Sequence, residues 1–492
     1  MAGARFAEEL RQRDPASSRF DISVVGDEPH AAYNRILLSP VVAGRVTPRE
    51  TRLKPDGWWA AHDIDVVTGA AVTDLDVVER TAVLDGLSPT VLRWDELVLA
   101  TGSAPFVPPM RGHTTEAAGV VPFRTIEDSA RIIRLGSAAR HAVVIGGGLL
   151  GLEAARGLLG RGLDVTVVHA ADFPMERQLD ADGGAVLARV VREVGARLVL
   201  GRCVVARHVE GSTRTVELDD GALLPADLVV VSAGVRPRVD LAERAGLVVE
   251  RGIVVDDRLA TSSPHVHAIG ECSQHRGHVP GLVQPGWEQA RVLADLLGGS
   301  GPEARYEGTS VLTRLKAPDI DLTSMGTVDV DVHDDDHEVL TFTDPRRGRY
   351  AKLVLDGDRL VGAILLGVGD AAGAVTQLYD TSAVAPRDRL ALMLGRAVTR
   401  VGAPQSVNLA EMPGTTVICR CNTVTKADIV TAHRDGCSSV GAVAEATRAT
   451  TGCGSCTSAV EGLCSWLRSA DPAPHSPEPV RTAASPPAEG AA

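Results

Sequence analysis

The sequence predicts an α/β protein of several domains, with a doubly wound parallel sheet at its centre. At 492 residues the chain is too long for one ordinary domain. The apolar run 142–145 is typical of a short buried strand, and the alanine-rich run that ends at Leu159 is typical of a helix. The spacing G-x-G-x-x-G joins them, and a second strand is predicted at 164–169, at the distance expected in a β-α-β unit.

The glycine spacing at the end of the first strand indicates nucleotide binding. Gly146 allows a tight turn, Gly148 lets a pyrophosphate approach the backbone, and Gly151 lets helix and strand pack closely. The phosphates are expected on the free N–H groups at the helix N-terminus. Glycine-rich turns are common, so the strand before the motif and the helix after it favour this interpretation over a structural turn.

The composition favours a globular protein whose main partner is neither nucleic acid nor a membrane. Hydrophobic residues make up 44% of the chain and charged residues 23%, and the net charge is -13. No apolar run approaches the ~20 residues of a membrane span, and no signal segment opens the chain. We therefore expect a cytoplasmic protein, whose 8 cysteines are metal ligands or free thiols rather than disulfides.

The N-terminal residues indicate the second half of another β-α-β unit. The first 13 residues are typical of a helix, and the strand predicted at 20–25 ends near Asp27 and Glu28, which are placed to hold an adenosine ribose. If Gly3 is the third glycine of a second fingerprint, a strand and two glycines precede the chain; the alternative is an ordinary N-terminal helix. We expect the former, and so expect the chain as written to hold its nucleotide weakly.

Three further segments carry motifs in the order expected around a central nucleotide fingerprint. They are YNRILLS at 33–39, LVLATG at 97–102 and VHAIGEC at 266–272. Together with VVIGGGLLGLE, this order resembles that of FAD-dependent pyridine-nucleotide oxidoreductases. In that family the glycine turn after LVLATG meets the flavin nucleotide, and the acidic residue after the later strand binds the ribityl and pyrophosphate portion. Asp is usual there, so Glu271 is a departure that some branches share.

The resemblance implies a set of cofactor-binding residues. Those expected to bind FAD are Gly3, Asp27, Glu28, Asn34, Arg35, Thr101, Gly102, Gly270, Glu271 and Trp287. Those expected to bind NAD(P) are Gly146, Gly148, Gly151, His169 and Gly234. Gly234 lies in LVVVSAGVRP, which resembles the strand and turn that close the nucleotide domain near the nicotinamide. No acid–base residue is assigned, because the redox chemistry belongs to the cofactors.

The sequence leaves the choice between NADH and NADPH open. An acidic residue about 20 residues past the fingerprint favours NADH, whereas an arginine there favours the 2′-phosphate of NADPH. The chain offers His169 at the strand end, then Asp172 and later Arg177. None of these residues decides between the two nucleotides, and only the family resemblance favours NADH.

Four cysteines near the C-terminus form a ligand pattern. They are Cys419, Cys421, Cys453 and Cys456, with 31 residues between the two pairs. Helices are predicted between the pairs at 426–434 and 440–447. Four thiolates fit an iron–sulfur cluster or a structural zinc, but zinc ribbons prefer C-x-x-C twice. The pattern resembles the 2Fe–2S domain of bacterioferritin-associated ferredoxin, which favours the cluster.

The other cysteines are expected to bind no metal. Before residue 400 the chain has only Cys203 and Cys272, which are far apart in sequence, and this disfavours a flavin disulfide reductase. Cys203 is expected to be a small buried residue. Cys437 and Cys464 fall outside the ligand pattern and are expected to pack in the small domain.

The motif order predicts an FAD domain that is split by an inserted NAD(P) domain, both of them doubly wound. The predicted segments are a first FAD-binding segment at 1–115, the NAD(P) domain at 116–243, a second FAD-binding segment at 244–308, an α+β interface domain at 309–400, a linker at 401–415, a small helical 2Fe–2S domain at 416–467 and a disordered tail at 468–492. In the family that the chain resembles, the interface domain dimerises and shields the flavin, so a homodimer is one option. The pair Asp356-Gly357 predicts a hairpin turn in this domain.

Nearly the whole chain resembles the N-terminal portion of the large subunit of NAD(P)H nitrite reductases, and the electron-transfer subunit of assimilatory nitrate reductases. The resemblance implies that electrons pass from the nicotinamide through FAD and the cluster to a nitrate or nitrite reductase. Nitrite-reducing subunits continue into a sirohaem and 4Fe–4S region, for which this chain has no further cysteines. We therefore expect electron delivery without nitrite reduction. The alternatives are a redox-sensing flavoprotein without turnover and an NADH-dependent reductase of a small soluble electron carrier.

Overall fold

The computed structural model describes most of the chain, in two compact units, 1–405 and 406–492. The described residues are 1–85, 90–112, 119–317, 320–395, 412–419, 422, 424–451 and 456–470. Cys421, Cys453, most of the predicted linker and nearly all of the predicted tail lie outside them.

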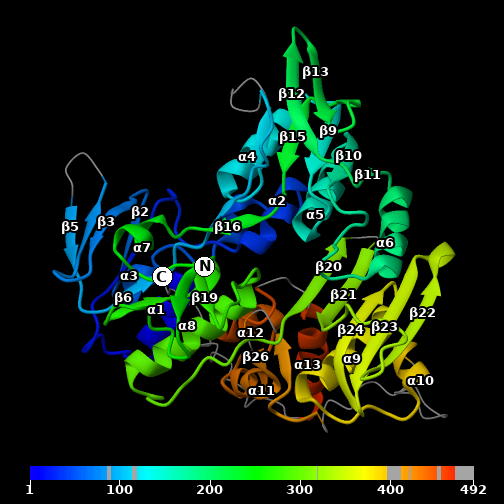
Figure 1. Ribbon diagram of the computed structural model, residues 1–492. Helices are drawn as coiled ribbons and strands as arrows, with labels where there is room; N and C mark the ends of the chain where they lie inside the picture. The colour runs from blue at the N-terminus through cyan, green and yellow to red at the C-terminus, as the bar shows by residue number, and fades with distance from the viewer. Residues whose placement is uncertain are drawn as a thin grey trace, which may run out of the picture. The chain divides into compact units, whose positions relative to one another are not determined.

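The first nucleotide-binding domain is assembled from two stretches that are distant in sequence. Helix α1 (Ala2–Arg13) packs along α8 (Val283–Gly298), as Figure 1 shows. Strand β6 (Leu97–Leu99) pairs in parallel with β18 (Val266–Ala268). Their apolar side chains form one core, which includes Phe6, Leu10, Leu99, Ile269 and Leu293. The two stretches that the sequence assigns to a split domain therefore share a core.

Smaller elements complete this domain. Strand β1 (Ile22–Gly26) pairs in parallel with β2 (Ile64–Thr68). The remaining elements are η1 (Arg35–Leu37), α2 (Leu38–Val42), η2 (Pro48–Thr51), α3 (Trp58–Ala61), the antiparallel strands β3 (Val72–Asp76), β4 (Thr81–Leu84) and β5 (Thr90–Arg93), α7 (Asp240–Arg244), β17 (Ile253–Val255), η4 (Gly270–Cys272) and β19 (Ser273–His275).

The inserted domain is built on a five-stranded parallel sheet in the order β11-β10-β9-β15-β8. These strands are β8 (Val120–Pro122), β9 (His141–Ile145), β10 (Asp164–His169), β11 (Arg197–Leu200) and β15 (Leu228–Val231). Strand order reverses at β9, since the chain goes on to β10 and β11 on one side and β15 lies on the other. Ligands bind at such switch points, beyond the carboxyl ends of the strands, and the G-x-G-x-x-G stretch follows β9 directly.

Both faces of this sheet are covered, which explains the continuous apolar runs of its strands. Ala142 and Val144 face helices α4 (Ile126–Gly136) and α5 (Leu149–Leu159). Val143 and Ile145 point to the opposite face, because side chains alternate along a strand. That face is covered by an antiparallel sheet of β12 (Val204–Glu210), β13 (Thr213–Leu218) and β14 (Leu223–Pro225).

A second sheet follows the split domain and is antiparallel throughout, in the order β20-β21-β24-β23-β22 (Figure 1). Its elements are β20 (Leu312–Ala317), β21 (Ile320–Gly326), β22 (Glu338–Asp344), η5 (Pro345–Arg347), β23 (Arg349–Asp356), β24 (Arg359–Leu366), α9 (Gly369–Thr381) and α10 (Arg389–Met393). The predicted turn is confirmed, since Gly357 has a φ of 55° between β23 and β24.

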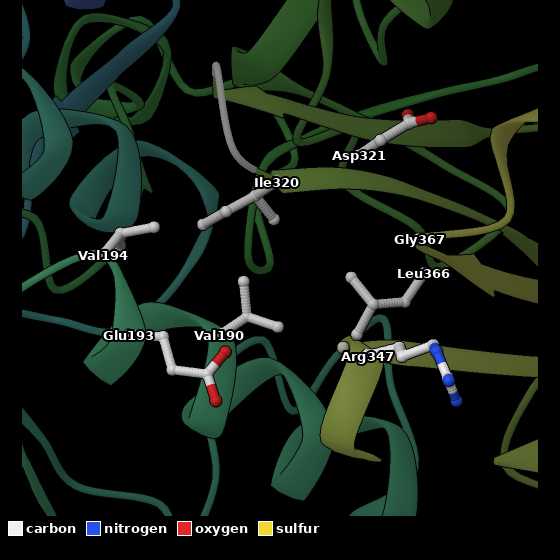
Figure 2. A pocket seen from close by; sticks show the side chains of 9 residues that line it. Val190, Glu193, Val194, Ile320, Asp321, Arg347, Leu366 and Gly367 are labelled. Atoms are coloured by element: carbon white, nitrogen blue, oxygen red, sulfur yellow. The ribbon is translucent and has the colours of Figure 1, made fainter. Parts of the chain in front are cut away.

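This sheet packs on helix α6 (Ala181–Glu193) of the inserted domain. Tyr350 and Lys352 of β23 both donate hydrogen bonds to Asp180 Oδ2, at 2.6 and 2.8 Å. A cavity of about 450 Å³ lies at the same joint. Figure 2 shows Val190 and Glu193 of α6 on one side of it and Leu366 of the sheet on the other. No residue that the sequence assigns to a cofactor lines this cavity.

The second unit is a small helical domain. It contains α11 (Lys426–Arg434), α12 (Val440–Thr447), α13 (Thr457–Ala470) and the strand pair β25 (Val417–Cys419) and β26 (Val424–Thr425). The first two helices have the bounds predicted from the sequence. Their apolar faces form a core with Cys419, Cys456 and Cys464. Two of the four potential ligands, Cys419 and Cys456, therefore lie inside the packed region of this unit.

Among the helices of the described ranges, none combines the length and the apolar character needed to cross a membrane.

Candidate functional site

The three fingerprint glycines occupy positions with different steric demands. Gly146 has a φ of +116°, and a Cβ there would lie 2.2 Å from the Ser232 carbonyl oxygen. A Cβ on Gly151 would lie 2.0 Å from the Gly146 carbonyl oxygen. Side chains are therefore excluded at both positions. A Cβ on Gly148 would meet nothing within 4 Å, although Gly148 caps α5.

The open space at Gly148 fits a phosphate. No side chain caps the N-terminus of α5, so its first N–H groups have no side-chain acceptor at that end. An anion is stabilised by such N–H groups and by the helix dipole. This geometry matches the roles inferred from the sequence: Gly146 and Gly151 permit close backbone packing, and Gly148 leaves room for the ligand.

His169 lies against this turn. Its side chain ends β10 and is 9% exposed. Its Nδ1 accepts a hydrogen bond from the Gly147 N–H at 3.1 Å, and its Nε2 lies 2.9 Å from Glu176 Oε2. Gly234, with a φ of +105°, follows β15 at the same end of the sheet. The structure thus brings together the residues predicted to bind NAD(P).

The residues predicted to bind FAD converge at the start of α1. A Cβ on Gly3 would lie 3.1 Å from the Ala100 Cβ at the end of β6, so helix and strand approach closely there. The Ala2 Cβ lies 3.0 Å from the Cβ position of Gly270, which has a φ of +76°. Gly102 is also left-handed, with a φ of +68°, and Thr101 Oγ1 donates to the Arg238 carbonyl. This crowding is what a third fingerprint glycine requires.

Charged side chains surround the same point. Glu28 accepts hydrogen bonds from Tyr33 Oη, at 2.5 Å, and from Arg35. Glu271 accepts one from Ser103 Oγ, at 2.5 Å, and one from Arg124.

The other predicted FAD residues lie on neighbouring elements. Asp27 pairs with Arg238 Nη1 at 2.7 Å. Asn34 is buried and its Oδ1 accepts from the Ile36 N–H, which starts η1. Trp287 is buried on α8, with the Arg5 guanidinium 5.9 Å from its ring centroid.

Sequence reasoning missed several polar partners at this site. Glu271 accepts hydrogen bonds from Ser103 and Arg124, and Asp27 accepts one from Arg238. In addition, Ser39 Oγ donates to Glu153 Oε2 at 2.6 Å. Each of these contacts joins segments that are far apart in sequence, and no motif marks them. Among these residues only Glu153 lies in a recognised motif, since it is the last residue of the fingerprint stretch.

Two of the four predicted cluster ligands lie together in the second unit. Cys419 is 2% exposed and Cys456 is 7% exposed. A hydrogen bond with Cys456 is the largest influence on Cys419 and, with the Thr450 N–H and Asn422, lowers the pKa of Cys419 to about 6. The described residues contain no group of three or more metal-binding side chains, since Cys421 and Cys453 lie outside them.

N–H donors point at both described sulfurs. The Thr450 N–H donates to Cys456 Sγ at 3.2 Å, and Asn422 Nδ2 donates to Cys419 Sγ at 3.7 Å. Thr450 has a φ of +70°, a strained conformation for a β-branched residue. N–H donors to sulfur and a lowered thiol pKa suit thiolates that bind a metal cluster. The chemistry of this donor set therefore fits iron–sulfur ligation.

The remaining cysteines divide between the core and the surface. Cys464 is 1% exposed, and Cys437 packs against the same core, as expected. Cys272 is buried, and its Sγ donates to the carbonyls of Leu99 and Ile269, at the ends of β6 and β18. Cys203 is exposed in the loop between β11 and β12, so the expectation that it is buried was wrong. The local sequence could not reveal that this loop leaves the sheet.

Comparison with known families assigns each region of the chain. Residues 1–291 match the pyridine nucleotide-disulphide oxidoreductase family. Residues 312–374 match the rubredoxin NAD+ reductase C-terminal domain, and residues 417–465 match the BFD-like 2Fe-2S binding domain. These matches cover both nucleotide sites and the cysteine quartet.

Similar proteins include two from Bacillus subtilis (strain 168). The NAD(P)H nitrite reductase is 36% identical over 94% of this chain and 56% of its own length. The assimilatory nitrate reductase electron transfer subunit is 36% identical over 96% of this chain and 59% of its own length. The chain thus spans a little over half the length of these relatives.

A solved structure extends the comparison to the fold. The ferredoxin reductase for the CYP199A2 system of Rhodopseudomonas palustris has a TM-score of 0.68 and 27% identity, with 78% of this chain and 94% of that chain covered. The family match over 1–291 implies FAD and NAD(P)H, and the match over 417–465 implies a 2Fe–2S cluster. The chain belongs to the pyridine nucleotide-disulphide oxidoreductase family, as an FAD-dependent NAD(P)H oxidoreductase with a 2Fe–2S domain.

Proposed function

We propose that this protein delivers electrons from NAD(P)H to a nitrate or nitrite reductase of nitrogen assimilation. The observation that carries the proposal is the combination of two nucleotide sites with a cysteine quartet, in a chain that aligns over more than nine-tenths of its length with the two Bacillus relatives. The acceptor that we propose is the catalytic protein of such a reductase; the chain itself spans a little over half the length of the two relatives.

The chain's own residues bind and orient the cofactors. Bound FAD would supply the chemistry that links a two-electron hydride donor to a one-electron acceptor such as a 2Fe–2S cluster. We assign FAD binding to the groups around the start of α1, with Gly3, Gly102 and Gly270 giving the backbone room and Glu28 and Glu271 accepting hydrogen bonds. Arg124 and Ser103 orient the Glu271 carboxylate.

The nicotinamide nucleotide is assigned to the β9–α5 turn. The open space at Gly148 and the free N–H groups of α5 hold its pyrophosphate, and Gly234 leaves room near β15. Cys419, Cys421, Cys453 and Cys456 are assigned to the cluster. Asn422 and Thr450 direct N–H groups at two of these sulfurs and so favour the thiolate form.

The cellular setting belongs to the same proposal. Free cysteines and thiolate ligands suit a reducing compartment, so we place the protein in the cytoplasm. We also propose the domain limits derived from the sequence, and a homodimer formed through the 309–400 domain.

The first experiment measures turnover. The purified full chain should oxidise NADH or NADPH steadily when an artificial one-electron acceptor is supplied. A redox sensor would be reduced once and then stop. Single-turnover behaviour with excess acceptor would therefore contradict the proposal.

The second experiment identifies the acceptor. Pull-down with the full chain, followed by identification of the bound protein, should recover a nitrate or nitrite reductase. The likeness to a ferredoxin reductase favours one other candidate, a reductase of a small soluble carrier. Transfer to a small ferredoxin, with no transfer to a nitrate or nitrite reductase, would select that candidate.

A further inference from the structure

The loop that follows β10 is fixed against the nucleotide fingerprint. The Met175 N–H donates to the Gly147 carbonyl oxygen at 3.1 Å. Met175 is fully buried and left-handed, with a φ of 56°. A buried side chain and a backbone hydrogen bond together leave the loop little freedom. The position of the next residue, Glu176, is therefore set by the fold.

Glu176 is coupled to the fingerprint through His169. Because the Gly147 N–H donates to His169 Nδ1, the ring carries its proton on Nε2. That proton is donated to Glu176 Oε2, at 2.9 Å. The Glu176 side chain is 39% exposed, so its carboxylate is accessible to a ligand near the end of β10. The last residue of β10 is His169 and not an acidic residue, but Glu176, seven residues later, places a carboxylate beside it.

Two arginines, Arg177 and Arg202, lie near this loop. Arg177 lines a cavity of about 520 Å³ together with Gln178 and Ser324, on the side of the antiparallel sheet. Arg202 Nε pairs with Asp220 Oδ2 at 2.8 Å, although its backbone N–H donates to the His169 carbonyl. A 2′-phosphate at the end of β10 would therefore meet the carboxylate of Glu176, whereas the Arg202 guanidinium is paired with Asp220.

We propose that Glu176, oriented by His169, binds the 2′-hydroxyl of the adenosine ribose and makes the protein selective for NADH. The inference rests on the proposed nicotinamide site at the β9–α5 turn. A carboxylate accepts hydrogen bonds from ribose hydroxyls and repels a phosphate, so one group both recognises NADH and rejects NADPH. Glu176 touches the nucleotide, whereas His169 is a positioning residue.

The test compares the two nucleotides in the full chain. In the native protein, kcat/KM for NADH should exceed that for NADPH by about 100-fold, since like-charge juxtaposition is strongly unfavourable. Glu176→Gln keeps an acceptor for His169 but loses the charge, and should lower this ratio about tenfold, mainly by improving NADPH. Glu176→Arg should reverse the preference. Asp172→Asn removes an exposed carboxylate of the same loop and serves as the matched control, with the ratio unchanged.

Binding of adenosine fragments gives a readout independent of turnover. By calorimetry, 5′-AMP should bind the native protein and adenosine 2′,5′-bisphosphate should bind about 100-fold more weakly, a difference that Glu176→Gln narrows. Equal binding of the two fragments, or a ratio that responds to Asp172→Asn and not to Glu176→Gln, overturns the inference. If both nucleotides reduce the flavin without preference, the inference falls while the proposed function stands. If neither reduces it, the proposed function falls.

Discussion

At the scale of single residues, the buried cysteine pair shows how the chain prepares a cluster site. Asn422 donates to Cys419 Sγ and also to the Arg448 carbonyl, so one amide links the first ligand pair to the loop before the second. Arg448 and Thr450 are both left-handed. The strain places a backbone N–H opposite Cys456. Sequence spacing finds the ligands but not these donors.

We predict that Asn422→Ala lowers the reduction potential of the cluster. A hydrogen bond to a ligand sulfur stabilises the more negative, reduced state, so its loss disfavours reduction. We expect about a tenfold change in the one-electron equilibrium, or about 59 mV. Potentiometric titration followed by electron paramagnetic resonance measures it. Ala446→Ser changes an exposed residue of α12 in the same unit and should leave the potential nearly unchanged; an equal shift in both variants would refute a specific role for Asn422.

Gly148→Val tests the fingerprint. A branched side chain would fill the open space above the start of α5, where the pyrophosphate is expected. FAD should be retained, while reduction of the flavin by NADH is lost, which anaerobic absorbance measures directly. Normal reduction by NADH in this variant would mean that the turn binds a different nucleotide.

At the scale of elements, helix α6 carries the joint between the inserted domain and the antiparallel sheet. Asp180 caps the helix through the Gly183 N–H and accepts hydrogen bonds from Tyr350 and Lys352. Burial opposes its ionisation, but the hydrogen bonds from Lys352 and Tyr350 hold the pKa of Asp180 below its ordinary value.

The joint should therefore weaken in acid. A carboxyl with a lowered pKa in the folded state adds stability above its ordinary pKa of 3.8, and that contribution is lost as the pH falls through the folded value. Asp180→Asn should cost about 3 kcal/mol at pH 7, because it leaves the buried Lys352 unpaired. The cost should shrink below pH 4. Thermal unfolding of the native protein and the variant between pH 3 and pH 7 measures this loss of stability. The control is Asp182→Asn, which changes an exposed carboxylate of the same helix. A loss of stability that does not change with pH would argue against the ion pair.

The helices and strands that were predicted correctly are marked in the sequence by short patterns, namely capping residues, apolar runs and glycine spacing. The helices at 426–434 and 440–447 begin after Thr425 and Ser439, whose side chains cap them. The sheet around β9 followed from apolar runs and glycine spacing. The contacts that hold the acidic residues did not follow, because Arg124 with Glu271 and Arg238 with Asp27 are distant in sequence. The exposure of Cys203 was mispredicted for the same reason, since it depends on where a loop leaves the sheet.

At the scale of the whole molecule, the proposed electron transfer depends on the two nucleotide sites and the cysteine quartet, all of which lie in this chain. Cys453→Ser should abolish the 2Fe–2S cluster while leaving reduction of the flavin by the nicotinamide intact, because the nucleotide sites belong to the other compact unit. Iron analysis and absorbance of anaerobically purified protein check both effects. Cys437→Ser changes a cysteine outside the quartet and should keep the cluster. One zinc and no iron in the native protein would contradict the assignment.

The chain enters and leaves the inserted domain at one place. Strand β7 (Ser103–Pro105) and strand β16 (Val235–Pro237) are antiparallel neighbours, with Pro105 opposite Val235. The segment between them begins and ends side by side, so it can be removed as a cassette. Joining Pro105 to Val235 through a short glycine bridge should keep both strands and leave a continuous flavin domain. The same adjacency lets a foreign nucleotide-binding domain be grafted at this seam to exchange the electron donor, as long as the graft supplies a counterpart of Arg124, which holds Glu271 of the flavin site.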